Sequence, residues 1–220
     1  MILRFKRGVL VTSLIGVLIT GGWFSNTAKV LALPQSEVFL KLSPIKVFVF
    51  TNNQGKFLTA FQKDGTEITN IYMSRDDAQK YLEEVRNKDP QLAKQLQLSE
   101  VSLAEIYKIA WDNKEKLFFS FFPKKEQVQL AREIKTNNPE GLNYSEGVPL
   151  FSATVGENQS FLTFEKNGNR IIPFFLDKNQ LQTLIDSLSI ERPELKNTVN
   201  IQIISLEQMI NLLIGSDNKH

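Results

Sequence analysis

The sequence predicts an α+β fold made of two pseudo-symmetric, duplicated halves, each with a small β-sheet and packed helices. In each half, strand-like runs rich in apolar residues are followed by runs with the apolar spacing of an amphipathic helix. The same order of strands, tight turn, helix and strand occurs twice, about 103 residues apart. Apolar residues make up 42% of the chain, which is ordinary for a folded globular protein.

The first 32 residues have the pattern of a secretory signal peptide and are set apart from the fold. The basic start MILRFKRG is followed by residues 8–24, which carry no charge, and then by small residues before a cleavage site after Ala32. An uncleaved membrane anchor is the alternative, but seventeen uncharged residues with two glycines in tandem are marginal for a bilayer core of ~30 Å. We therefore expect export, cleavage near Ala32 and a periplasmic location. Association with the envelope or the thylakoid lumen is a second possibility for the location.

The charge of the mature chain argues against a nucleic-acid partner. Four of the 26 basic residues and none of the 24 acidic residues lie in the leader, which leaves 22 basic and 24 acidic side chains, a net −2. Nucleic-acid-binding proteins need a basic surface. The chain also has no cysteine, which excludes zinc–thiolate sites and thiol catalysis.

The first half, residues 33–134, contains the first copy of the repeated pattern. Strand-like runs are expected at 46–50, 55–61, 67–73 and 96–101, and helix-like runs at 75–87 and 103–111. Ser74 with Asp77, and Ser102 with Glu105, have the spacing of helix-capping boxes. Pro90 is expected to end the first of these helices.

The second half, residues 148–216, repeats the pattern after a connector at 135–147, and a short tail follows at 217–220. Asp177 and Ser205 stand where helix caps are expected, and Pro193 is expected to end a helix. A shift of 103 positions gives nine identities without a gap: Phe61/Phe164, Lys63/Lys166, Gly65/Gly168, Ile68/Ile171, Gln79/Gln182, Pro90/Pro193, Leu92/Leu195, Ser102/Ser205 and Leu103/Leu206. Because turn, prolines and caps coincide in register, we interpret the pattern as an internal duplication.

Residues that could carry catalysis or hold a metal are scarce. The single histidine is His220, the last residue, and chain termini usually fray. The sequence has no G-x-S-x-G, H-E-x-x-H, P-loop or G-x-G-x-x-G motif. The carboxylate pairs at 76–77 and 83–84 lie on a predicted helix, where neighbouring residues point in different directions. We therefore expect no enzyme activity, no catalytic residues, no metal site and no cofactor.

Phenylalanine is the most informative residue type, with sixteen copies. The run LFFSFF (117–122) sends Phe119 and Phe121 to one face of a strand, and Phe118 and Phe122 to the other. The simpler interpretation is a central strand that is buried on both faces. The alternative is that one face lines an apolar groove for a partner, and Phe174 with Phe175 poses the same choice.

Five segments of the chain carry a resemblance to a known family. They are GVPLFSAT (147–154), IIPFFLDKNQLQTLIDSL (171–188), RPEL (192–195), IQIISLEQMI (201–210) and SLAEIYKI (102–109). In their order they resemble the family of the twenty-two-kilodalton component of the chloroplast inner-envelope translocon (Tic), in its cyanobacterial form. The resemblance covers roughly residues 44–214. It implies two pseudo-symmetric α+β halves with apolar grooves, a soluble periplasmic or intermembrane-space protein and no catalytic residues.

The resemblance also implies a function, a chaperone-like role in preprotein transfer or outer-membrane biogenesis. The expected partners are an outer-membrane barrel assembly protein or unfolded outer-membrane and precursor proteins, and peripheral association with a membrane is compatible with this role. The expected client-binding residues are Phe48, Phe50 and Tyr72 in the first half, and Phe151 and Phe175 with Pro149 in the second. Phe118 and Phe122, which share one face of the strand at 117–122, are expected to bind a client at the seam between the two halves. The alternatives are an exported enzyme whose carboxylates converge from both halves, and a purely structural envelope protein.

Overall fold

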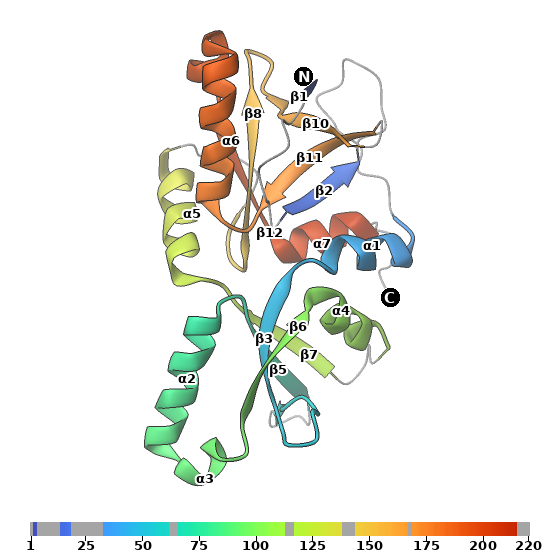
Figure 1. Ribbon diagram of the computed structural model, residues 1–220, viewed down its shortest axis with the longest axis vertical. Helices are drawn as coiled ribbons and strands as arrows, with labels where there is room; N and C mark the ends of the chain where they lie inside the picture. Colours follow the sequence, from blue (N-terminus) through green and yellow to red (C-terminus); the bar gives the residue numbers. More distant parts are fainter. Residues whose placement is uncertain are drawn as a thin grey trace. The chain divides into compact units, whose positions relative to one another are not determined.

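The computed structural model describes residues 2–3, 14–18, 33–61, 66–112, 117–137, 144–166 and 169–214 (Figure 1). The described elements form a mixed α+β chain with its strands in two sheets, which confirms the predicted α+β class. The chain divides into two compact units: unit 1 comprises Met1–Lys41 and Glu126–His220, and unit 2 comprises Leu42–Lys125. The predicted first half therefore contributes its two ends, 33–41 and 126–134, to unit 1.

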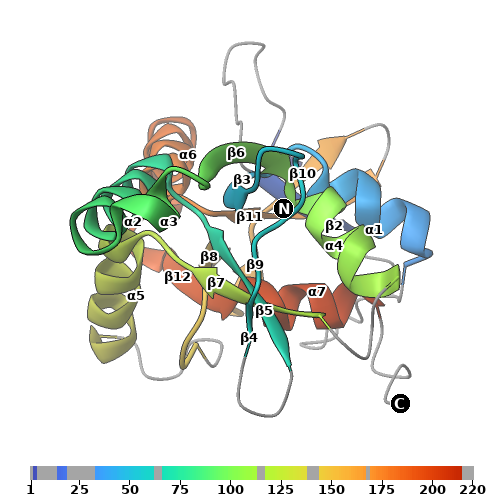
Figure 2. The same ribbon diagram turned by 90° about the horizontal axis from the view of Figure 1, so that it is seen from below.

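Unit 2 is built on a sheet with the strand order β4–β5–β3–β6, in which β7 also pairs with β5 (Figure 2). The pairs are antiparallel except β5 with β7, which is parallel. The strands are β3 (Lys46–Thr51), β4 (Ala60–Phe61), β5 (Glu67–Tyr72), β6 (Gln97–Ser102) and β7 (Leu117–Phe122). The helices are α2 (Arg75–Lys88), α3 (Pro90–Ala93) and α4 (Leu103–Asp112), and α2 packs on β3 and β5.

Unit 1 is built on a sheet with the strand order β1–β10–β11–β8–β12, in which β2 also pairs with β11 and β9 with β8. The strands are β1 (Ile2–Leu3), β2 (Leu14–Leu18), β8 (Pro149–Val155), β9 (Ser160–Phe161), β10 (Thr163–Lys166), β11 (Asn169–Phe175) and β12 (Asn200–Ser205). The helices are α1 (Gln35–Leu42), α5 (Lys125–Asn137, from Glu126 in unit 1), α6 (Lys178–Glu191), the 3₁₀ helix η1 (Pro193–Thr198) and α7 (Leu206–Ile214).

The two sheets pair their strands at positions that differ by 103 residues. Lys46 pairs with Ser102 in unit 2, and Pro149 pairs with Ser205 in unit 1. Phe48 meets Tyr72, and Phe151 meets Phe175, at the point where two antiparallel strands join. The strand register therefore follows the sequence offset in both units. Common descent of the two halves by duplication stays an interpretation.

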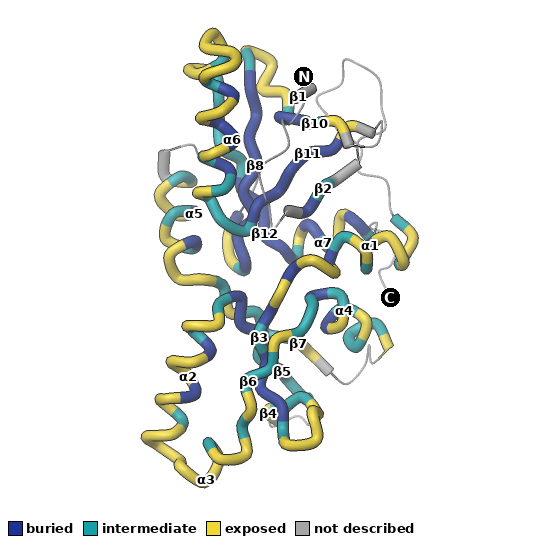
Figure 3. The backbone as a smooth tube through the Cα atoms, in the orientation of Figure 1, coloured by how far each residue is buried: buried dark blue, intermediate teal, exposed yellow. Residues whose placement is uncertain are grey.

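Each unit has a core in which a helix covers the sheet. In unit 1, α6 contributes buried Leu181 and Leu188 to a cluster that includes Phe151, and every residue of β8 is buried (Figure 3). In unit 2, Ala78 and Leu82 of α2 pack with Phe50 and Tyr72. The apolar side chains at helical spacing along α6 and α2 therefore hold these helices against their sheets.

The predicted helix caps are confirmed. Ser74 accepts a hydrogen bond from the Asp77 amide, and Asp177 accepts one from the Asn179 amide. The box at Ser102 is reciprocal, because the Glu105 amide donates to the Ser102 hydroxyl and the Ser102 amide donates to the Glu105 carboxylate. Ser205 and Gln208 form the same pair of bonds. In both units these caps start a helix directly at the end of a strand.

The two prolines that were expected only to end helices also begin the next short helix. Pro90 is the first residue of α3, and Asp89 caps this helix by accepting hydrogen bonds from the amides of Gln91 and Leu92. Pro193 likewise begins η1. Proline is favourable at a first helical position, because its missing N–H would have no partner there.

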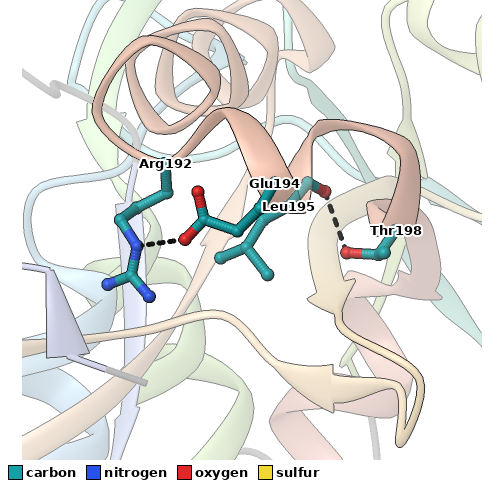
Figure 4. A network of polar contacts seen from close by, with 4 residues as sticks. All are labelled: Arg192, Glu194, Leu195 and Thr198. Carbon is teal, nitrogen blue, oxygen red and sulfur yellow. Dashed lines mark hydrogen bonds and ion pairs between the residues drawn. The ribbon is translucent and has the colours of Figure 1, made fainter.

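The loop after α6 is organised by polar contacts around η1 (Figure 4). Arg192 Nε donates to Glu194 Oε1 at 2.6 Å, and this bond lowers the pKa of the Glu194 carboxyl group. Thr198 Oγ1 donates to the Leu195 carbonyl at 2.8 Å and accepts from the Gly156 amide at 3.0 Å. The threonine therefore ties η1 to the turn after β8, whereas the exposed ion pair adds little stability.

The helix α1 and both leader strands were not predicted as part of the fold. Residues 35–42 form α1, and residues 2–3 and 14–18 of the leader form β1 and β2. The expected strand at 55–61 is reduced to β4 and a single bridge between Thr51 and Phe57. None of the described helices has the length and apolar content needed to cross a bilayer.

Several predicted features lie wholly or partly outside the described residues. They are the leader at 4–13 and 19–32 with its cleavage site, most of the turn at 63–66, part of the turn at 166–169, residues 138–143 of the connector, and the tail with His220. Leader cleavage and the tail therefore stay predictions.

Phe151→Ala should strongly destabilise the protein. The side chain is fully buried in the core of unit 1, so its loss removes apolar burial and leaves a cavity. We expect the free energy of unfolding to fall by about 3–5 kcal/mol, measured by chemical denaturation. Ile190→Ala is the matched control, because the Ile190 side chain is 81% exposed and its removal should change stability little. Equal effects of the two substitutions would contradict the assigned core.

Candidate functional site

Of the seven residues predicted to bind a client, five are buried or half-buried and two are exposed. Phe151 and Phe175 belong to the buried core of unit 1, and Pro149 is buried as well. Phe50 and Tyr72 are buried beside α2 in unit 2, and Phe48 is half-buried against them. Only Phe118 (54% exposed) and Phe122 (41% exposed) offer a large surface to solvent. Client binding by any of the seven stays a prediction.

Phe118 and Phe122 are exposed because β7 lies at the edge of its sheet. Ile68 pairs with Phe118 and Tyr72 pairs with Phe122 along β5, and no other described strand pairs with β7. The interpretation of 117–122 as a central strand buried on both faces is therefore wrong. Phe119 and Phe121, on the opposite face, are half-buried.

Phe122 belongs to a larger aromatic cluster that extends from β7 to α2. Phe122 stacks on Tyr72 with ring centroids 4.9 Å apart and planes at 19°. Tyr72 lies 5.8 Å from Tyr81 of α2, and Phe50 lies 5.6 Å from Tyr81. Such contacts are worth about 0.5–1.5 kcal/mol per pair beyond buried area. The buried rings of Phe50 and Tyr72 therefore support those of Phe122 and Tyr81.

We define the aromatic patch as Phe118, Phe122 and Tyr81, three exposed rings in unit 2. Tyr81 is 39% exposed. Tyr81 lies on α2, which packs on β3 and β5. Apolar rings held by a fixed support bind other apolar groups with little loss of side-chain entropy. No described strand pairs with the outer edge of β7 beside these rings, and such an edge can pair with another chain.

Tyr72 carries the one strongly altered ionisable group of this cluster. Burial, with the nearby Tyr81, raises the pKa of Tyr72 to about 12, while the Asn70 side chain opposes the rise. The Tyr72 hydroxyl is inaccessible and makes no hydrogen bond of good geometry with the described residues. The phenol is therefore neutral at physiological pH and contributes to the patch as an aromatic support.

Chemical groups suited to metal binding do not gather in the described part of the chain. No group of three or more His, Asp or Glu side chains there could hold a metal ion. Asp76 and Asp77 lie in the first turn of α2, where Ser74 caps the helix. Negative side chains at this position complement the helix dipole, which supports their interpretation as part of the cap.

The fold defines a class, namely α+β proteins built of two sheet units. Residues 18–220 match the model of the Tic22-like family, and the chain belongs to this family. The resemblance seen in the sequence is therefore confirmed.

Two solved structures share this fold. Anabaena Tic22, described as a protein-transport protein, superposes with a TM-score of 0.70 at 24% identity, over 85% of this chain and 88% of its own. Tic22 from Plasmodium falciparum gives a TM-score of 0.60 at 18% identity, over 79% of this chain and 85% of its own. No curated protein matches the chain.

Tyr72→Phe should leave the protein as stable as before or make it more stable. A buried hydroxyl without a hydrogen bond costs about 1–3 kcal/mol, whereas the ring keeps its stacking on Phe122. We expect the free energy of unfolding to stay constant or to rise by up to about 1 kcal/mol, measured by chemical denaturation. A loss of stability comparable to that of Tyr72→Ala would show that the hydroxyl has a partner.

The raised pKa of Tyr72 should also make stability depend on pH in alkaline solution. The unfolded chain releases the phenol proton near its ordinary pKa of 10, and the folded chain holds it to about 12. The stabilisation is therefore complete below pH 10 and is lost as the pH rises through 12, at no more than about 1.4 kcal/mol per pH unit.

Burial raises the pKa of Tyr107 and of Tyr144 in the same direction, so Tyr72→Phe is needed to isolate one residue. Unfolding free energies measured between about pH 9 and 12 should fall less steeply for Tyr72→Phe than for the natural chain. Parallel curves would contradict the assignment.

Proposed function

We propose that this chain is a periplasmic, non-enzymatic chaperone-like factor that binds unfolded outer-membrane or precursor proteins during their transfer. The observation that carries this proposal is the exposure of Phe118 and Phe122 on an edge strand, with Phe122 joined to exposed Tyr81 through the ring of Tyr72. These rings would form the client-binding surface. An outer-membrane barrel assembly protein is the second partner class that the proposal includes.

Physical chemistry supports binding of unfolded chains by this patch. Exposed aromatic rings grouped together are unfavourable in water, and such patches mark interaction surfaces in soluble proteins. An unfolded client presents apolar side chains at many places, and their burial against the rings contributes roughly 25 cal/mol per Å². Recognition of this kind depends on hydrophobicity more than on sequence, as a factor for several clients requires.

The leader and the relatives support the location and the process. The basic, apolar and small-residue segments of the first 32 residues have the order of an export signal. Anabaena Tic22 carries the description protein transport, and the family match makes the same process a reasonable assignment for this chain. Binding of transported polypeptides is the activity that links this process to an aromatic surface.

Phe118→Ser combined with Phe122→Ser should weaken client binding without unfolding the protein. Because both rings are about half exposed, their removal costs less stability than Phe151→Ala, although Phe122 loses its stacking on Tyr72, whereas a bound client loses its contacts. An unfolded outer-membrane barrel protein is diluted from urea, and its aggregation is followed by light scattering with increasing amounts of the chain. Each ring should contribute on the order of 1 kcal/mol to binding, so the double variant should bind at least about tenfold more weakly.

Ile190→Ser and Leu40→Ser are the matched controls, because these side chains are 81% and 74% exposed and belong to unit 1, outside the patch. They should suppress aggregation as well as the natural chain does. If the double variant keeps its melting temperature and still suppresses aggregation fully, the patch is not the binding surface. If the natural chain never suppresses aggregation, a structural envelope role replaces the proposal.

A further inference from the structure

The outer edge of β11 is covered by a strand that comes from the leader. β2 pairs antiparallel with β11 over five residues, from Leu14 opposite Phe175 to Leu18 opposite Ile171 (Figure 1). Ile171 also pairs with Phe164 of β10, and Phe175 also pairs with Phe151 of β8. Since a strand has only two edges, β2 occupies the edge opposite to β10 and β8.

The corresponding edge in unit 2 belongs to β5 and is covered by β7, a strand that lies outside the leader. β5 lies 103 positions before β11, and its pairs with β4 and β3 likewise leave one edge, which β7 covers from Glu67 to Tyr72. β7 remains in the chain after export, whereas β2 lies within the segment expected to be removed after Ala32. Loss of the leader would therefore leave β11 without the only strand described on that edge.

The side chains of β2 show which residue types fit a strand that pairs with this edge of β11. Ile15, opposite Phe174, is fully buried, so an apolar side chain is required at this position. Gly16 lies opposite Pro173, and a Cβ atom added to it would come within 3.1 Å of Ile171 Cδ1. A small residue is therefore favoured at the centre of the incoming strand, between apolar neighbours.

Pro173 and Lys41 are two further features that favour reversible pairing of another strand with β11. Pro173 has no N–H, and a proline within a strand is typical of sheet edges, where it limits indiscriminate pairing. Lys41 Nζ donates to the Gly16 carbonyl at 2.6 Å. This contact is to the backbone, so it would hold any strand seated in the same register.

We propose that in the exported protein the edge of β11 from Ile171 to Phe175 captures an extended apolar segment of a client polypeptide as an added antiparallel strand. The segment takes the place of Leu14–Leu18 and carries a small residue opposite Pro173. This rests on the proposed client-binding function and on leader removal. In strand addition, backbone hydrogen bonds supply affinity and the positions of alternate side chains supply selectivity.

The probe for this edge is a fluorescent peptide with the sequence of residues 12–20, TSLIGVLIT. The chain is exported with its own leader in a bacterial host, and the mass of the purified product gives its N-terminus. Fluorescence anisotropy should show peptide binding, and amide hydrogen exchange of residues 169–176 should slow when the peptide is added. A peptide carrying Ile15→Asp or Gly16→Val should bind at least about tenfold more weakly, because it cannot fill the Ile15 or Gly16 position.

Lys41→Met should weaken peptide binding by about fivefold, as expected for the loss of one hydrogen bond. Lys46→Met, an exposed lysine of unit 2, should leave it unchanged. The proposal is overturned if the exported product retains residues 14–18, if the peptide and its Ile15→Asp form bind equally, or if protection appears elsewhere. A dimer that the peptide dissociates would assign the edge to a second copy and would also overturn it.

The same measurements keep this inference distinct from the proposed function. Phe118→Ser with Phe122→Ser should leave peptide binding at β11 unchanged, since these residues belong to unit 2. Peptide binding without aggregation suppression would refute the chaperone-like role and retain the strand-capture edge. Aggregation suppression without peptide binding would do the reverse.

Discussion

Two antiparallel ladders, β3 with β6 and β8 with β12, are the interactions on which the other elements depend. Each joins strands that are distant in the sequence, and each is extended by one backbone hydrogen bond beyond its last pair of strand residues. The Leu103 amide donates to the Ile45 carbonyl, and the Leu206 amide donates to the Val148 carbonyl, both at 2.8 Å. Because Ser102 and Ser205 cap at the same place, α4 and α7 begin where the ladders end. Their position is therefore set by sheet pairing.

The ladders also determine what the inner strands β5 and β11 present to their surroundings. Each inner strand meets its central neighbour at one residue pair only, Phe48 with Tyr72 or Phe151 with Phe175. A short strand pairs with the other end of each inner strand on the same side, β4 at Glu67 and Ile68 and β10 from Asn169 to Ile171, so the opposite edge is left for a strand from elsewhere. Unpaired edges invite pairing with other chains. The chain meets this need by two routes, β7 in unit 2 and the leader strand in unit 1.

The same architecture separates two ways of contacting another polypeptide. On β7, exposed rings offer apolar side-chain contacts, which tolerate many sequences because they have little directionality. On β11, backbone hydrogen bonds and a small-residue position would impose a direction and a register. Under the proposed function the two are complementary, since apolar contact would retain a client and strand pairing would orient one segment of it.

Local signals in the sequence predicted many of the strands and helices, because they act between neighbouring residues. Ser74, Ser102, Asp177 and Ser205 all cap helices as expected, since a hydroxyl or carboxylate reaches amides two or three positions along the chain. The 103-residue spacing was interpreted as a duplication, and the structure shows strand pairs at the same offset in both sheets. The role of Pro90 and Pro193 was predicted only in part: the end of one helix was expected, but the start of the next was not. A proline begins a helix only when the next residues of the chain also adopt helical conformation.

The sequence by itself determined the α+β class, the caps and the family, whereas only the tertiary structure decided which aromatic residues reach solvent. Phe118 and Phe151 both occupy apolar strand segments, and no local property separates them. One lies on an edge strand and the other on a strand buried throughout. Exposure depends on which strands and helices lie across from a side chain, and these are contributed by distant parts of the chain. That long-range dependence is why the core and the candidate site could not be distinguished before the fold was known.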